Sequence, residues 1–565
     1  MQTLGTPRVD TPRLARVPAT LALLIALAAG AFCYAPALRA FFAQDDFAFL
    51  ALVRLLHQPW LLFVHDHFPA SLYFRPLGVF VWWCVCAVAD ATAWPQYAVN
   101  MVLHLGCVAA LYALLQRLRR DAWLNALWAA LFAVHPLAVG TTLWLSDRFD
   151  LLTTLFSLLA VEAALAYAAR PRASRLVLVL AALLCALLSK ELGVVGSAAA
   201  FAAVAFAPRV SLSLAQRASA LAAISLLTLG WLAYRHAMLT PIPGLDSMVV
   251  SPATFAEGAW RWLRTGGEFL AHDPRMTLLV FVLLAIAAML WLGAVIASRL
   301  GRRSEDRRWG EAAAVAALCL MPGFVQAPVA VHHLGDLDAQ TFWFALIVAS
   351  RFYHLALAGL ICALMLAASP LIARNSRGGR PRLIVAGALV LALVALAPAT
   401  QGIAHAYASE TRKQVAPLQA FDDALARSTL PAHGCQVYVL GADAIWGLAG
   451  YADAIAKGLA VDPARVAHCL IATERLPYTY FVRTGSVQPE DYRPLQPLAL
   501  AGKAVPWLTL GDVQAIYFTM GEDLSVATLP ASTSFLEYRD GAFVDVSEAV
   551  RSGQRKIDFA IPKPH

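Results

Sequence analysis

The chain has 565 residues, of which 60% are hydrophobic and 14% charged, and its formal net charge is +8 at pH 7. Apolar runs long enough to cross a bilayer recur between residues 18 and 400, which excludes a wholly soluble protein. The positive charge lies in short loops between these runs rather than on a polar domain, so the charge does not indicate a nucleic-acid partner.

The basic loops predict the topology of the chain, because short loops rich in Lys and Arg stay in the cytoplasm. The N-terminal segment 1–17 carries three arginines and is predicted to be cytoplasmic. The predicted fold is an all-α polytopic membrane protein with a transmembrane domain over 18–400. Its eleven predicted helices are 18–39, 97–116, 122–139, 149–168, 176–190, 192–208, 218–236, 277–298, 310–330, 343–369 and 383–400.

The apolar segment 76–90 is not counted among the spans. A crossing there would place the basic stretch 117–120 on the outer side. We therefore expect this segment to lie along the outer interface or to re-enter from it, a position that suits Trp82 and Trp83. The two long outer loops are then 40–96 and 237–276.

The tail 401–565 is more polar and is predicted to be a small soluble α/β or β-rich domain outside the cytoplasm. Strands are expected at 435–440, 466–472 and 513–518, and a helix at 443–459. Cys435 and Cys469 could form a disulfide in that compartment.

Two adjacent carboxylates, Asp45 and Asp46, follow the first apolar run. Charge at the edge of a bilayer must be hydrated, paired or used. One acid could act as a general base while its neighbour orients it, since crowding of like charges raises one of the two pKa values. The alternative is a solvated helix end without a catalytic role.

Further polar motifs follow the acid pair in a fixed order: the Y-F-R-P-L segment 73–77, His135-Pro136, the W-L-S-D-R-F-D-L-L segment 144–152, the L-L-S-K-E segment 187–191 and the R-F-Y-H-L segment 351–355. This order resembles the GT-C superfamily of membrane glycosyltransferases, which use polyprenyl-phosphate sugars. The likeness is greatest to the protein O-mannosyltransferase-like branch and covers roughly residues 15–360.

The resemblance implies a role for each matched position. Asp45 matches the acid that deprotonates the acceptor, and Asp46 supports it. Arg351 is expected to bind the donor phosphate, and Arg148 and Lys190 are further candidates for that contact. The alternative for Arg351 is a side chain that only extends to the lipid headgroups.

Four residues are expected to shape or support the site: Arg75, His135, Asp150 and Glu191. Simpler roles remain open for three of them. Asp150 could only favour the helix dipole, His135 could only end a helix before Pro136, and Glu191 could only form an ion pair with Lys190.

No cofactor is required by these residues, but a divalent metal remains an alternative. The ligand types are supplied by His65 and His67 in the first outer loop and by His332 and His333 near a later one. Neither cluster has a spacing specific for metal, and polar loops often collect such residues.

The resemblance therefore implies an inverting hexosyltransferase, which we expect in a bacterial-type plasma membrane. Its partners would be membrane lipids, a polyprenyl-phosphate sugar donor, and a protein, lipid or envelope-glycan acceptor on the outer face. One alternative is a glycan polymerase or ligase that uses lipid-diphosphate donors. The other is a transporter or flippase, which would usually carry ionisable groups near the middle of the bilayer.

Overall fold

The computed structural model describes the following residues of the chain: 16–66, 73–207, 211–239, 251–271, 309–334, 342–374, 380–442, 445, 447–448, 450–474, 479–486, 495–497, 499–500, 503–504, 508–520 and 525–557. Within these ranges, side chains of some residues at helix ends and of most strand residues between 495 and 520 are not described.

Long apolar helices form the larger part of the molecule. Within the described ranges, seven helices are long and apolar enough to cross a membrane, and a bent pair around His135 makes an eighth. The protein is therefore a multi-pass membrane protein. The helices of this bundle are α1 (Arg16–Tyr34), α4 (Ala93–Leu118), α5 (Ala122–Val134), α7 (Arg148–Ala169), α8 (Ala173–Ser189), α9 (Gly193–Ala205), α10 (Leu214–Met238), α13 (Trp309–His333), α15 (His354–Arg374) and α16 (Arg380–Arg412).

Ten of the eleven predicted spans correspond to these helices, and the remaining one, 277–298, lies outside the described residues. Two spans are interrupted where continuous helices were expected. The helix predicted over 122–139 ends at Val134, because Pro136 cannot donate the next backbone hydrogen bond and disfavours helix at His135. The helix predicted over 343–369 is divided into α14 (Phe342–Ser350), the 3-10 turn η7 (Arg351–Tyr353) and α15.

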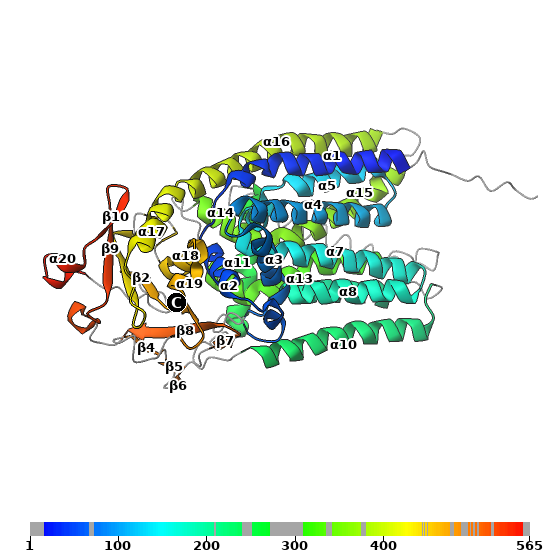
Figure 1. The fold of residues 1–565 in the computed structure, drawn as a ribbon. Helices are drawn as coiled ribbons and strands as arrows, with labels where there is room; N and C mark the ends of the chain where they lie inside the picture. The colour runs from blue at the N-terminus through cyan, green and yellow to red at the C-terminus, as the bar shows by residue number, and fades with distance from the viewer. Residues whose placement is uncertain are drawn as a thin grey trace, which may run out of the picture.

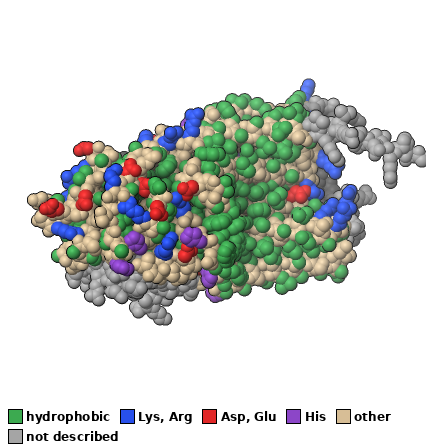
Figure 2. Space-filling view, in the orientation of Figure 1, with side chains coloured by type: hydrophobic (Ala, Val, Ile, Leu, Met, Phe, Trp, Pro, Cys, Tyr) green, Lys and Arg blue, Asp and Glu red, His purple; other side chains and the backbone are tan. Residues whose placement is uncertain are grey.

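The long helices run side by side, and the C-terminal domain lies at one end of the bundle (Figure 1). Figure 2 shows a broad hydrophobic band over the bundle, with charged side chains on the C-terminal domain and a smaller, mostly basic group at the opposite end. Such a band between two polar ends is the surface expected of a protein that spans a bilayer.

Figure 1 shows α2 (Asp45–Leu55), α3 (Pro76–Ala89) and α11 (Pro252–Ala271) at the end of the bundle next to the C-terminal domain. The 3-10 helix η3 (Pro59–Phe63) contacts α3, and the short helix α6 (Val139–Leu143) contacts α14. The segment 76–90 thus forms a helix of 14 residues, which is short for a bilayer span. It packs between α2 and α8. Its predicted place at the membrane interface remains a prediction.

The C-terminal domain begins as α16 continues to Arg412 and is followed by α17 (Val415–Arg427). Its main sheet has the order β10-β9-β1-β2, in which β1 is parallel to both neighbours and β10 is antiparallel to β9. A second sheet has β8 between β3 and β4, with β7 also paired to β8. The strands are β1 (Gln436–Leu440), β2 (Leu470–Thr473), β3 (Thr479–Arg483), β4 (Leu495–Pro497), β5 (Ala499–Leu500), β6 (Lys503–Ala504), β7 (Leu508–Leu510), β8 (Val513–Met520), β9 (Ser534–Arg539) and β10 (Ala542–Asp545).

The predicted mixture of strands and helices in the tail is confirmed, with two corrected boundaries. The helix expected at 443–459 is α18 and begins only at Ala452. The strand expected at 466–472 begins later, because the apolar residue Val466 ends the short helix α19 (Pro463–Val466) before β2 starts. Helix α20 (Ser547–Arg551) follows the last strand.

Candidate active site

The acid pair Asp45-Asp46 forms the first turn of α2. Acidic side chains at this position interact favourably with the positive end of the helix dipole. The residue before them, Gln44, has φ 49° and ψ −117°, a backbone conformation that residues with a side chain rarely adopt. Contacts around this turn therefore hold it in an unfavourable conformation.

Asp46 is fully buried, and both of its carboxylate oxygens accept hydrogen bonds. Its Oδ1 accepts from the backbone amide of Ser146 at 2.8 Å and from the Ser146 hydroxyl at 2.5 Å. Its Oδ2 accepts from the backbone amide of Ala43 at 2.9 Å. Burial nevertheless raises the pKa of Asp46 to about 7, because removal from water penalises the charged form more than these donors favour it.

Asp45 is only half-buried, unlike its neighbour. The Tyr451 hydroxyl, which belongs to the C-terminal domain, donates to Asp45 Oδ1 at 2.8 Å. No hydrogen bond from a described residue reaches Asp45 Oδ2. The two acids thus differ. Asp46 is buried and accepts three hydrogen bonds, whereas one oxygen of the half-buried Asp45 accepts none from a described residue.

The chain just before the acids is fixed from two neighbouring helices. The backbone amide of Phe41 donates to Thr411 Oγ1 of α16 at 3.0 Å. The Tyr97 hydroxyl of α4 donates to the Phe41 carbonyl at 2.7 Å. The start of α2 is therefore positioned by helices from the beginning and the end of the bundle.

One short segment links the acid pair to the late arginine. Ser146, which holds Asp46, belongs to the 3-10 turn η5 (Leu145–Asp147). Two residues earlier, the ring of Trp144 lies under the Arg351 guanidinium, with 4.9 Å between the guanidinium carbon and the ring centroid. Asp46 and Arg351 therefore contact residues only two positions apart.

A glycine allows η7 to approach this segment. The Gly140 amide donates to Ser350 Oγ at 2.9 Å. A Cβ atom at Gly140 would lie 2.0 Å from the Ile347 carbonyl oxygen, so a side chain at this position would force the two segments apart. The absence of a side chain at Gly140 is thus a condition for the contact between Trp144 and Arg351.

Arg351 is partly buried, and its guanidinium also lies 5.1 Å from the Phe352 ring centroid. Among the described residues, no acid or carbonyl accepts a hydrogen bond from this guanidinium. Aromatic faces hold the cation through its plane and leave its N–H groups for an anion.

Arg148, predicted to contact the donor phosphate, is fully buried. Its Nε donates to Asn100 Oδ1 at 2.7 Å and its Nη2 to the Gln96 carbonyl at 3.0 Å. The guanidinium lies 4.8 Å from the Trp82 ring centroid, and Nη1 has no partner among the described residues. These contacts fit a residue that fixes α4 and α7 beside the acid pair, and a phosphate contact remains only a prediction.

Lys190 forms an ion pair with Asp150, and its Nζ lies 3.9 Å from Asp147 Oδ1. The exposed fractions of these side chains are 12% for the lysine, 1% for Asp150 and 3% for Asp147. The ammonium group of Lys190 therefore pairs with one buried acid and lies close to a second. The predicted alternative of an ion pair between Lys190 and Glu191 is wrong, because Glu191 pairs with Arg75 instead.

Glu191 binds Arg75. Both Nε and Nη2 of Arg75 donate to Glu191 Oε2, at 3.1 and 2.9 Å. Arg235 of α10 lies 3.6 Å from the other carboxylate oxygen. Burial alone would raise the pKa of Glu191, but the two guanidinium groups hold it below its ordinary value. This network ties α3, α8 and α10 together near the site.

His135 ends α5, as its simpler interpretation predicted. Its Nδ1 accepts from the Leu137 amide at 3.1 Å, and its side chain is buried. It therefore acts as the N-cap of the turn that follows.

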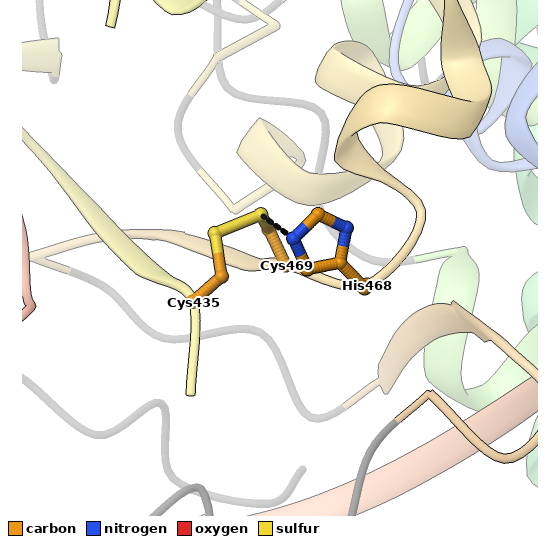
Figure 3. A group of neighbouring side chains, drawn as sticks. All are labelled: Cys435, His468 and Cys469. Atoms are coloured by element: carbon orange, nitrogen blue, oxygen red, sulfur yellow. Dashed lines mark hydrogen bonds between the residues drawn. A yellow bond between two sulfur atoms is a disulfide. The ribbon is translucent and has the colours of Figure 1, made fainter. Parts of the chain in front are cut away.

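The metal alternative gains no support within the described ranges. His67 lies outside them, the side chains of His332 and His333 are not described, and His65 joins no cluster of ligands. The one candidate group in this part of the chain is Cys435, His468 and Cys469 (Figure 3). Its cysteines form the predicted disulfide, and disulfide sulfurs are not thiolate ligands, so this group does not fit a metal.

Two residues of the site could not be identified from sequence. Ser146 lies within a recognised motif but has no feature that distinguishes it from a loop serine. Tyr451 is 406 positions from Asp45, in a domain with no motif at all. Only the three-dimensional packing brings each of them to a carboxylate.

The sequence was compared with those of known proteins. No protein-family model matches the chain. A mouse protein O-mannosyl-transferase, TMTC1, is 28% identical over 166 residues, which cover 26% of this chain and 17% of that protein. The predicted resemblance to the protein O-mannosyltransferase-like branch is thus confirmed over a limited region.

Solved structures of two membrane proteins are similar at low identity. The oligosaccharyltransferase AglB from Archaeoglobus fulgidus, in complex with an inhibitory peptide and a dolichol-phosphate, has a TM-score of 0.41 at 15% identity, over 79% of this chain and 64% of that one. ArnT from Cupriavidus metallidurans, bound to undecaprenyl phosphate, has a TM-score of 0.33 at 14% identity, over 88% of this chain and 97% of that one.

Proposed function

We propose that this protein is a membrane glycosyltransferase of the GT-C type, which moves a sugar from a polyprenyl phosphate to an acceptor hydroxyl. The observation that carries the proposal is that one short segment contacts both the acid pair and a cation. Ser146 donates to Asp46, the neighbour of the half-buried Asp45. Two residues earlier, the Trp144 ring lies against the Arg351 guanidinium. The partial likeness to a protein O-mannosyl-transferase supports it, since that relative is named for the transfer of a sugar.

The proposed reaction uses each group once. Asp45 takes the proton of the acceptor hydroxyl, and the acceptor oxygen forms a bond to the anomeric carbon of the sugar. The bond from that carbon to the phosphate oxygen breaks, and its electron pair leaves with the polyprenyl phosphate. Attack from the face opposite the leaving group inverts the anomeric centre.

The charges around the acids suit this division of labour. The N–H groups of Arg351, which no described residue accepts from, would stabilise the negative charge on the departing phosphate. Asp46 positions the start of α2 through Ser146. Lys190 and Arg75 are already paired with Asp150 and Glu191, and these pairs connect the ends of neighbouring helices. Arg351 would therefore be the cation that binds the phosphate of the sugar donor.

The proposed orientation places this end of the bundle outside the cytoplasm of a bacterial-type plasma membrane. The basic group at the opposite end and the disulfide in the C-terminal domain both support that orientation. The acceptor would then be a protein, a lipid or an envelope glycan that meets the membrane from outside.

Profiling of a deletion strain tests the proposal. We expect one glycan to disappear and a polyprenyl-phosphate monosaccharide to accumulate, and we expect the wild-type gene to reverse both changes. Complementation with Asp45→Asn should fail, whereas the control Asp540→Asn, at an exposed turn of the C-terminal domain, should succeed. Full complementation by Asp45→Asn would refute the assigned base. Accumulation of a lipid-diphosphate oligosaccharide would instead favour a polymerase or ligase.

A further inference from the structure

The C-terminal domain packs directly on the helix that carries the acid pair. Helix α18 (Ala452–Leu459) lies against α2, where a Cβ atom at Gly458 would be only 3.3 Å from the Ala51 amide nitrogen. Arg54, near the end of α2, donates to the carbonyls of Gly458 and Ala460 at 2.9 and 2.7 Å. The two helices are therefore joined by close packing and by charge-assisted hydrogen bonds.

Helix α18 is itself fixed to the sheet behind it by a buried ion pair. Lys457 Nζ donates to Asp453 Oδ1 at 2.5 Å and to the Cys469 carbonyl at 2.8 Å. The Asp453 oxygens also accept from the amides of Ile471 and Phe481, both at 3.2 Å. Both charged groups are thus satisfied, and the pair sets the position of α18 relative to β2 and β3.

Tyr451 is the residue immediately before α18, and this rigid support aims its hydroxyl at the acid pair. The hydroxyl donates to Asp45 Oδ1 at 2.8 Å. Burial and the negative charge of Asp45 raise the pKa of Tyr451 well above its ordinary value, so this hydroxyl stays protonated and remains a donor. A carboxylate held through one oxygen presents the other in a single direction.

We propose that Tyr451 is a positioning residue of the transferase, so that the C-terminal domain completes the site by orienting Asp45 toward the acceptor hydroxyl. This inference rests on the proposed function, because it assigns Tyr451 to the base of that reaction. It also explains why the C-terminal domain packs on the bundle. Asp45 is aligned when the domain is docked on α2, and it loses its orienting donor when the domain is displaced.

The test compares Tyr451→Phe with Tyr438→Phe, a buried tyrosine of β1 that packs in a different apolar cluster from α2. Each full-length variant is expressed in the deletion strain, and the rate at which the missing glycan returns is measured. Each is also purified for thermal unfolding and for binding of undecaprenyl phosphate as the probe. We expect Tyr451→Phe to slow glycan formation about 10-fold or more, with lipid binding and unfolding temperature as in wild type. Tyr438→Phe should keep the wild-type rate.

Two outcomes would overturn the inference. A wild-type rate for Tyr451→Phe would show that the hydroxyl has no role in the reaction. A parallel loss of rate, lipid binding and unfolding temperature would show that the tyrosine serves only the docking of the domain.

The variant Asp45→Asn separates this inference from the proposed function. If Asp45→Asn is inactive and Tyr451→Phe is fully active, only the role of Tyr451 fails. If Asp45→Asn is fully active, the assignment of Asp45 as the general base is wrong, whatever the activity of Tyr451→Phe. Because Tyr451 acts through Asp45, the double variant should be no slower than Asp45→Asn alone. An additive further loss would show that Tyr451 acts elsewhere.

Discussion

Ser146 donates both its backbone amide and its hydroxyl to the same oxygen of Asp46, at 2.8 and 2.5 Å. The two residues are 100 positions apart, and this contact joins the start of α2 to the 3-10 turn η5. This contact distinguishes the two acids of the pair. Asp46 is buried and accepts hydrogen bonds on both oxygens, whereas Asp45 is only half-buried.

The buried state of Asp46 predicts a dependence of stability on pH. The pKa of Asp46 in the folded protein is about 7 against an ordinary 3.8, so the folded state binds more protons than the unfolded state between these values. The contribution of Asp46 to stability is therefore present below about pH 4 and is lost as the pH rises through about 7. We expect Asp46→Asn to flatten this part of the curve of unfolding temperature against pH. Equal slopes in wild type and variant would contradict the prediction.

The hydroxyl of Ser146 provides a second test of the same contact. This donor lowers the pKa of Asp46, so Ser146→Ala should raise that pKa further. The loss of stability with rising pH should then extend to higher pH than in wild type. Thr142→Ala serves as a control, because its buried hydroxyl donates to the Ala138 carbonyl instead.

Arg351 should determine the affinity for the lipid phosphate. Its guanidinium lies over Trp144 and donates to no described residue, and lysine cannot reproduce that planar set of donors. We expect Arg351→Lys to weaken the binding of undecaprenyl phosphate about 10-fold and Arg351→Ala to weaken it more. Binding is measured on purified protein in detergent, with Arg483→Lys at an exposed position of β3 as the control. Unchanged binding by Arg351→Ala would assign the phosphate to another cation.

Lys190 should contribute to stability because it forms an ion pair with the buried Asp150. Lys190→Met would remove this direct pair and leave Asp150 only the more distant charge of Arg75, at a cost of about 3 kcal/mol. Replacing Asp150 by Asn in the same chain removes its charge and should recover part of the loss. Chemical unfolding of the single and double variants measures both effects. A single variant as stable as wild type would mean that Asp150 is protonated or hydrated.

The sequence predicted the parts of the fold and site that depend on local pattern. Apolar runs and basic loops identified ten helices, since a membrane span must be long and apolar whatever it packs against. The acids Asp45 and Asp46 and the cation Arg351 were recognisable because charge at a membrane edge is costly and therefore rarely accidental.

The roles within the site could not be predicted in the same way. The difference between Asp45 and Asp46 depends on which neighbour contacts which oxygen, and Ser146 and Tyr451 come from distant segments. Arg148 carried the same signal as Arg351 in the sequence, but packing encloses it among Gln96, Asn100 and Trp82. Whether a charged side chain is exposed depends on tertiary packing, and a short sequence motif does not determine it.

The disulfide should stabilise the C-terminal domain and, through it, the site. Cys435 and Cys469 are 34 positions apart, and the Cys469 carbonyl also accepts from Lys457 of α18. Replacing both cysteines by serine should lower the stability of the domain by about 2–4 kcal/mol. Unfolding in denaturant measures the change, and a reducing agent should reproduce it in the wild-type protein only. Equal sensitivity of the serine variant to reduction would attribute the effect to another cysteine.

The strained residue Gln44 gives the last prediction. Its φ of 49° with ψ of −117° is a conformation that glycine adopts without penalty, whereas a residue with a Cβ atom is strained there. Gln44→Gly should therefore stabilise the protein by about 1 kcal/mol, whereas Gln44→Ala, which keeps the Cβ atom, should bring no gain. Gln58→Gly is the matched control, because Gln58 precedes a 3-10 helix with an ordinary φ of −118°. If the strain serves to aim Asp45, Gln44→Gly will also slow glycan formation in the deletion strain, while the control keeps the wild-type rate. A Gln44→Gly protein less stable than Gln44→Ala would show that the backbone at this turn is not strained.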